Sequence, residues 1–131
     1  MIRLLDTSVA ILLRDDAVAA NRFLAALDAR PVLSAITKVE LEGGVYARPQ
    51  MLAQRRRRLD ALLRTFEVVD FNADMATNYG GIVQRVGFSR RKIIDRMIAA
   101  TALSLNAVLM TTNVGDFAEI DGLEFGTWPA A

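Results

Sequence analysis

Short apolar stretches alternate with helical segments from one end of this chain to the other, and this order restricts its fold more than any other feature. The apolar stretches predict buried strands at residues 2–5, 32–34, 68–69, 107–110 and 123–125. Helices are predicted between them, beginning near residues 9, 15, 37, 49, 75 and 94. Strands and helices that alternate in this way form a parallel sheet covered on both faces. The sequence therefore predicts an α/β fold, a three-layer α/β/α arrangement with a central parallel sheet of about five short strands.

Length and composition indicate one folded domain. The chain has 131 residues, of which 53% are hydrophobic, enough for a single packed core. No linker, repeat or low-complexity tract divides it, so one domain is predicted over residues 1–131. Charged residues interrupt the apolar stretches near the start, unlike a signal peptide, and none approaches the ~18 apolar residues of a membrane span. A cytoplasmic protein with no membrane segment is the expectation.

Two residue types are missing, and their absence limits the chemistry. The chain contains no cysteine, which excludes disulfides and thiolate metal sites. It also contains no histidine, which excludes Ser-His-Asp catalysis, histidine-ligated zinc and a histidine general base. Any catalysis must therefore use carboxylates, hydroxyls, lysine, arginine or a bound metal ion.

Four acidic residues are predicted to meet at one edge of the sheet. Asp6 follows the first predicted strand, and Asp116 lies a few residues beyond the fourth. Because ligands of open α/β sheets bind at the carboxyl ends of the strands, both side chains are expected at the same edge. Asp95 lies at the start of one predicted helix, and Glu40 lies in the first turn or so of another. The four carboxylates could thus converge from four separate segments.

Such a cluster would suit a divalent metal ion. Neighbouring carboxylates repel one another, and without a cation some of them take up protons. Mg²⁺ prefers oxygen ligands and can lower the pKa of a water molecule that attacks phosphorus. A second ion about 3.5–4 Å away can stabilise the leaving oxygen. The missing and the present residue types therefore favour the same metal-assisted chemistry.

Each acidic residue also has a local interpretation, which the sequence leaves open. Asp6 could cap the helix that follows it, and Asp95 could cap its own helix. Thr37 and Glu40 have the spacing of a capping box, and Asp116 could serve a loop turn. The spacing of any one of these residues is a weak signal, and only the four together in a histidine-free chain favour a metal site.

Basic residues give weaker signals. Apart from the four acidic residues, the chain has 16 basic and 11 acidic residues, a balance compatible with a nucleic-acid partner. Arg90, Arg91 and Lys92 lie just before Asp95 and are candidates for contact with RNA phosphates. The arginine run at residues 55–58 spans most of a helix circumference, which is typical of a solvated face.

Several segments together resemble the PIN-domain nucleases, and within them the VapC-type toxins of toxin–antitoxin pairs. The segments occur in the family's order, and they are LLDTS at 4–8, SAITKVELEGG at 34–44, IDRMIAATAL at 94–103, LMTTNVGDF at 109–117 and LEFGTW at 123–128. The middle of the chain has no motif to anchor the alignment, and the turn before Asp95 is more basic than the family commonly shows. Glu42 lies about 200° around a helix from Glu40, so only one of them can face the cluster, and the motif favours Glu40.

The resemblance implies a PIN-like fold, a site for Mg²⁺ or Mn²⁺ and endoribonuclease activity. It assigns the metal and the catalysis to Asp6, Glu40, Asp95 and Asp116. It places supporting hydrogen-bonding groups beside them at Thr7 and at Thr112 or Asn113. It further implies an RNA substrate such as tRNA, a homodimer and an antitoxin protein that inhibits the enzyme.

The sequence also allows two other functions. A phosphohydrolase could use Asp6 as a covalent nucleophile, but the pattern requires a second aspartate two residues later, where this chain has Ser8. A PIN-like module could instead bind RNA or protein without cutting, and an incomplete acidic quartet would favour it. Metal binding separates this module from the nuclease.

Overall fold

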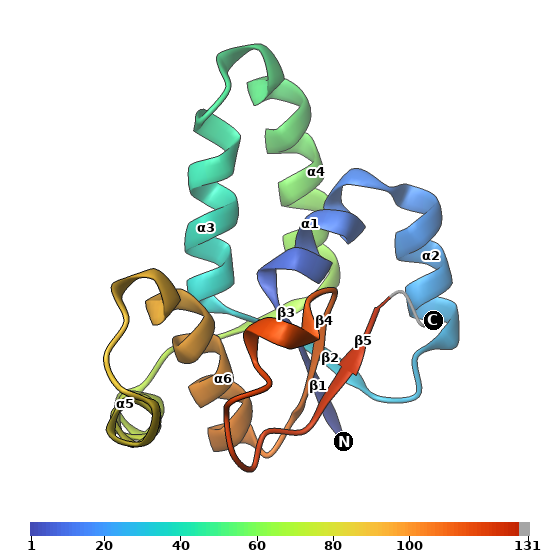
Figure 1. Ribbon diagram of the computed structural model, residues 1–131. Helices are drawn as coiled ribbons and strands as arrows, with labels where there is room; N and C mark the ends of the chain where they lie inside the picture. Colours follow the sequence, from blue (N-terminus) through green and yellow to red (C-terminus); the bar gives the residue numbers. More distant parts are fainter. Residues whose placement is uncertain (129–131) are drawn as a thin grey trace.

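A five-stranded parallel sheet forms the centre of the protein in the computed structural model, which describes residues 1–128 (Figure 1). Neighbouring strands follow the order β3-β2-β1-β4-β5 and all pair in parallel. Their bounds are β1 (Ile2–Leu5), β2 (Arg30–Ser34), β3 (Glu67–Val69), β4 (Val108–Thr111) and β5 (Phe125–Thr127). The chain builds outward from β1 in one direction and then returns to its other side with β4. The carboxyl ends of β1 and β4 therefore form the switch point at which such sheets bind ligands.

Helices cover both faces of the sheet, as the three-layer prediction requires. They are α1 (Thr7–Asp15), α2 (Ala17–Ala26), α3 (Ala35–Tyr46), α4 (Leu52–Thr65), α5 (Ala73–Val86) and α6 (Ile93–Leu105). Short 3-10 turns lie at Pro49–Met51 (η1), Arg90–Lys92 (η2) and Val114–Asp116 (η3). None of the helices within residues 1–128 is long and apolar enough to cross a membrane.

The core is divided by the sheet into two apolar layers. Leu5 and Leu33 pack with buried side chains of α1, α2, α3 and α4 on one face. Leu4 and Val32 pack with α5 and α6 on the other face. This division follows from the alternation of side chains along a strand. Figure 1 shows α3 and α4 extending together beyond the strand ends, so that the switch point lies at the base of this pair.

Two sequence predictions about local structure differ from the fold. The last strand is Phe125–Thr127 rather than 123–125, because its pairing with β4 begins at Phe125 opposite Leu109. Helix α3 begins at Ala35 rather than near 37, because the Ser34 side chain accepts the N–H of Ile36.

Candidate functional site

Asp6 is the most rigidly held of the predicted site residues. It follows β1 and is the N-cap of α1, where its carboxylate accepts the N–H of Val9 at 3.1 Å. Its Oδ1 also accepts the Ser8 hydroxyl, and its Oδ2 accepts the Thr111 hydroxyl at 2.6 Å. Only 5% of Asp6 is exposed. The capping interpretation is therefore confirmed, and the same contacts fix the carboxylate at the end of the sheet.

This environment argues against Asp6 as a covalent nucleophile. Both of its oxygens already accept hydrogen bonds from the protein. Ser8 stands where a phosphohydrolase of this kind would need its second carboxylate, and its hydroxyl serves to hold Asp6. These hydrogen bonds orient the Asp6 carboxylate as a charged or ligand-binding group rather than as a nucleophile.

Glu40 approaches the same edge from α3. The Thr7 hydroxyl donates to Glu40 Oε1, and the hydroxyls of Thr7 and Thr37 lie 3.0 Å apart. The capping-box interpretation of Thr37 and Glu40 is wrong, because Ser34 caps this helix and Thr37 is buried within it. Glu42 turns away and binds Arg56 of α4 with two hydrogen bonds of 2.7 and 2.9 Å. The choice of Glu40 over Glu42 thus agrees with the geometry.

Asp95 shows that the four acidic residues share one electrostatic environment. It lies in the first turn of α6 and is not the N-cap, a position that Lys92 occupies. Partial burial raises the pKa of Asp95 above its ordinary value, and the charges of Asp116, Asp6 and Glu40 raise it further. The charge of Lys92 opposes this shift. Carboxylates from three other segments therefore act on the pKa of Asp95.

The loop after β4 holds Asp116 with its own polar groups. The Asn113 side chain donates to Asp116 Oδ2 at 2.7 Å, and the Asn113 N–H donates to the Thr111 hydroxyl at 2.9 Å. Thr112 contributes through its backbone N–H, which donates to Ser8 Oγ at 3.2 Å. The sequence pointed to Thr112 and Asn113 but missed Thr111 and Ser8. The sequence does place one hydroxyl residue at the end of β4 and another just after β1. That pattern points to the site only once β1 and β4 are known to be neighbours.

Some basic residues near the site have exposed side chains, and others bind protein groups. Arg90 and Arg91 are exposed in η2, just before α6. Lys92 is engaged with Glu119 at 3.0 Å. The arginines of α4 contact protein groups, as Arg55 donates to the Gly44 carbonyl and Arg58 to the Asp15 carbonyl. The prediction of a solvated face is therefore correct only for Arg57 and Arg58, which are exposed, whereas Arg55 and Arg56 are half-buried.

The acidic quartet has no cationic partner among residues 1–128. Among the ion pairs formed within residues 1–128, none involves Asp6, Glu40, Asp95 or Asp116. In the same part of the chain, no group of three or more acidic side chains is arranged so that it could hold a metal ion. Asp6, Glu40 and Asp116 each face a hydroxyl or amide donor instead. The donor chemistry, oxygen atoms from four carboxylates, is nevertheless the set that hard divalent ions prefer.

Similarity to known proteins extends over nearly the whole chain. Residues 3–123 match the family model described as PIN domain. Ribonuclease VapC1 of Haemophilus influenzae strain R2866 is 35% identical over 133 residues, which cover 98% of each chain. The tRNA(fMet)-specific endonuclease VapC of Shigella flexneri is 28% identical over 98 residues, 73% of this chain and 74% of that protein. The solved structure of VapBC2 from Rickettsia felis bound to a promoter DNA fragment has a TM-score of 0.82 at 28% identity, covering 98% of this chain and 99% of that one.

Replacement of Asp95 by asparagine should stabilise the metal-free protein at neutral pH. The pKa of Asp95 is raised in the folded state, so the folded protein binds more protons than the unfolded chain between the ordinary and the raised pKa. Stability is therefore lost as the pH rises through that window, and Asp95→Asn removes this loss. The gain should shrink as the pH falls toward about 3.9, the ordinary pKa of aspartate. Urea unfolding in a chelator at several pH values measures it.

The control for this experiment is Asp70→Asn, which removes one exposed carboxylate outside the quartet. It should leave the dependence of stability on pH nearly unchanged. An equal gain in both variants would mean that net charge, rather than the surroundings of Asp95, determines the effect.

Proposed function

The chain belongs to the PIN domain family, and we propose that it acts as a VapC-type ribonuclease, the toxin of a toxin–antitoxin pair. Full-length similarity to ribonucleases of this kind supports the proposal. The observation that carries it is the acidic quartet at the carboxyl end of the sheet, four carboxylates that form no ion pair with any cation in residues 1–128. Repulsion among four carboxylates opposes folding, but the same carboxylates can bind a divalent cation that acts on a polyanionic substrate.

We propose that Asp6, Glu40, Asp95 and Asp116 hold Mg²⁺ or Mn²⁺. Asp6 is fixed by its hydrogen bonds, whereas Glu40 and Asp116 are exposed and each accepts one side-chain donor that an ion could replace. When bound, a divalent ion supplies a Lewis acid next to the phosphate and lowers the pKa of water there. The relief of repulsion among the four carboxylates would favour rotation of the two exposed side chains toward the ion.

The other residues of the site would orient this machinery. The hydroxyls of Ser8 and Thr111 keep Asp6 in one rotamer, and Thr7 and Asn113 guide Glu40 and Asp116. Such outer contacts tune the affinity of metal ligands in proteins. Exposed Arg90 and Arg91 are proposed to contact phosphates of the substrate, since guanidinium groups bind phosphate oxygens in pairs.

The proposed substrate is RNA, with tRNA as the first choice because one relative is a tRNA-specific endonuclease. Attack of water on the phosphodiester would leave a 5′-phosphate and a 3′-hydroxyl. The proposed protein partner is an antitoxin that inhibits the enzyme, since relatives of similar fold belong to VapBC toxin–antitoxin systems.

Purified protein should cleave tRNA only when Mg²⁺ or Mn²⁺ is present, and Asp95→Asn should abolish the cleavage. Gel analysis of total tRNA with the metal ion, with a chelator and with the variant measures both effects. Asp70→Asn is the matched control and should cut like the wild type. Cleavage that persists in Asp95→Asn would come from a contaminant, and an absence of both cutting and Mn²⁺ binding would favour the non-catalytic binding module.

Thr111→Val should weaken metal affinity or activity by about 10–100-fold, the usual effect of removing an outer contact to a metal ligand. Thr111 is fully buried, and valine keeps its shape while removing the donor to Asp6. The control is Thr127→Val, the same change at an exposed position in β5. Dissociation constants for Mn²⁺ from calorimetry, measured without RNA, give the comparison. Equal affinities in the two variants would separate Thr111 from the metal site.

We also propose that two copies of the chain associate through α3. Val39 and Tyr46 are 66% and 61% exposed and lie seven residues apart, on the same side of this helix. Val39→Asp should convert a dimer to a monomer, as measured by light scattering during size-exclusion chromatography. Val18→Asp, at an equally exposed position in α2, should leave the mass unchanged. A monomeric wild-type protein would refute the association.

A further inference from the structure

Arg96 is a buried cation that joins three segments of the chain. It lies on α6 next to Asp95 and is only 3% exposed. Its Nη1 donates to the Gly87 carbonyl at 2.6 Å, and its Nη2 donates to Glu119 Oε1 at 3.2 Å. The same oxygen accepts Lys92 Nζ at 3.0 Å. We refer to Arg96, Lys92, Glu119 and the Gly87 carbonyl as the Arg96 clamp.

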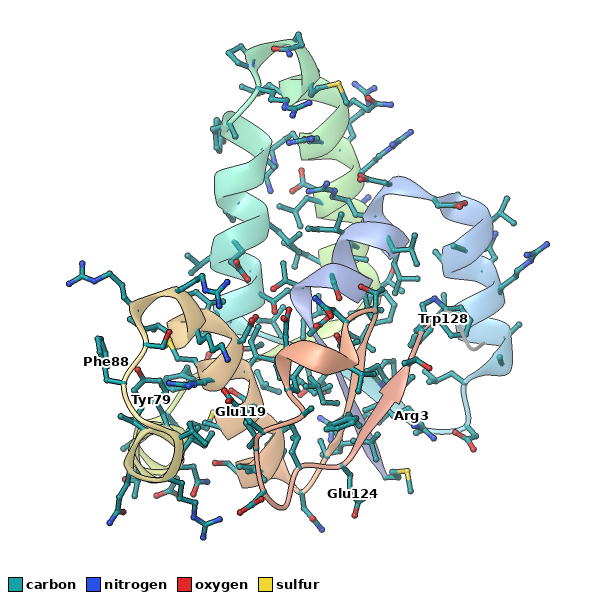
Figure 2. The ribbon with its side chains drawn as sticks, viewed as in Figure 1. Arg3, Tyr79, Phe88, Glu119, Glu124 and Trp128 are labelled. Atoms are coloured by element: carbon teal, nitrogen blue, oxygen red, sulfur yellow. The ribbon has the colours of Figure 1, made fainter. Side chains whose placement is uncertain are left out.

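The three joined segments carry the chemical groups of the proposed site. Helix α6 carries Asp95, and Glu119 follows Asp116 by three residues in the loop after η3. The third segment is the turn at 87–92, which carries the exposed arginines. It begins at Gly87, whose φ of +84° lies in the left-handed region that favours glycine. Figure 2 shows Glu119 beside α6, where the loop passes the helix.

Fold stability does not account for a guanidinium at this position. Phe117 and Ile120 of the same loop are buried in the apolar layer and already anchor it to the core. A buried ion pair is often no more stabilising than apolar side chains of similar volume. Moreover, the buried Nε of Arg96 has no hydrogen-bond partner in the described part of the chain, which is an added cost. The residue is better explained by a requirement for a defined geometry than by its contribution to stability.

That requirement is present at the site. Asp95 and Asp116 are both acidic, and no ion pair within residues 1–128 involves either of them. Like charges that share a site repel each other. Repulsion favours movement of the loop away from α6. The bond between Arg96 and Glu119 crosses between these two segments and opposes that movement.

We infer that Arg96 is a positioning residue that acts through Glu119 to hold the loop carrying Asp116 against the helix carrying Asp95. The inference rests on the proposed function, because it assumes that these two carboxylates share a metal ion. By limiting their separation before the ion arrives, the clamp reduces the reorganisation that binding requires. Its loss should therefore weaken metal binding more than it lowers the rate at saturating metal.

The first test variant is Glu119→Gln, which removes the accepting charge from a half-exposed side chain and leaves the core intact. The second is Arg96→Met, which fills the buried space without the guanidinium. The matched control is Asp121→Asn, the same change two residues later in the loop, at a carboxylate that pairs with Arg85 at 3.6 Å. If Arg96→Met does not fold, Glu119→Gln alone decides.

Two measurements on these proteins are needed. Amide hydrogen exchange of the metal-free protein should become faster at residues 113–120 in Glu119→Gln and Arg96→Met, but not in Asp121→Asn. Calorimetric Mn²⁺ affinity without RNA should fall by about 10-fold or more in the first two variants, within the range known for outer contacts of metal ligands. The double variant should lose little more than either single variant, because both remove the same bond.

The outcomes separate this inference from the proposed function. If the wild type binds Mn²⁺ and both variants bind it within twofold of wild type, the positioning role is refuted while the metal site stands. If the wild type does not bind Mn²⁺, the proposed metal site is refuted, and hydrogen exchange alone tests the clamp. Unchanged exchange at residues 113–120 in both variants would refute the clamp in either case.

Discussion

The parallel pairing of β1 with β4 brings together segments more than 100 residues apart, and the site depends on it. Leu5 lies opposite Met110, and the Asp6 N–H continues the ladder by donating to the Met110 carbonyl at 2.9 Å. The next residue along β4 is Thr111, whose hydroxyl reaches the Asp6 carboxylate. The register between β1 and β4 thus sets both the end of the sheet and the orientation of the buried Asp6 carboxylate. A shift of one residue would turn Thr111 to the opposite face.

The polar groups that contact the quartet carry no charge, so they do not neutralise its negative charge. Hydroxyl and amide donors contact Asp6, Glu40 and Asp116, whereas three arginines bind carboxylates outside the quartet. Arg56 binds Glu42, Arg14 binds Asp15, and Arg96 binds Glu119. A guanidinium in the quartet would stabilise the fold and occupy the place of an ion. Partial burial raises the pKa of Asp95, and the charges of the other three carboxylates raise it further.

The sequence predicted the parts of the structure that depend on local pattern and on the general topology of parallel sheets. Asp6 and Asp116 could be assigned to one edge because each follows a predicted strand. Thr111 could not, because its role depends on which strands are neighbours. Arg96 was missed for the same reason, since its partners lie 9 and 23 residues away. The capping box at Thr37 was wrong because Ser34, one turn earlier, had already begun the helix. In each case a nonlocal contact or an earlier cap decided between interpretations that the local sequence allowed.

The proposed metal site would combine fixed and adjustable ligands, a combination that suits an ion that binds reversibly. Asp6 is buried, and Asp95 is partly buried on a helix, so these two would provide a preformed half. Glu40 and Asp116 are exposed, and each would give up one hydrogen bond to Thr7 or Asn113 in order to reach an ion. Hydrogen bonds to charged groups contribute about 1.5–3 kcal/mol each. In the proposed site, relief of repulsion within the quartet would oppose that cost, so the net affinity would depend on how well the protein limits the movement of the Asp116 loop before the ion arrives.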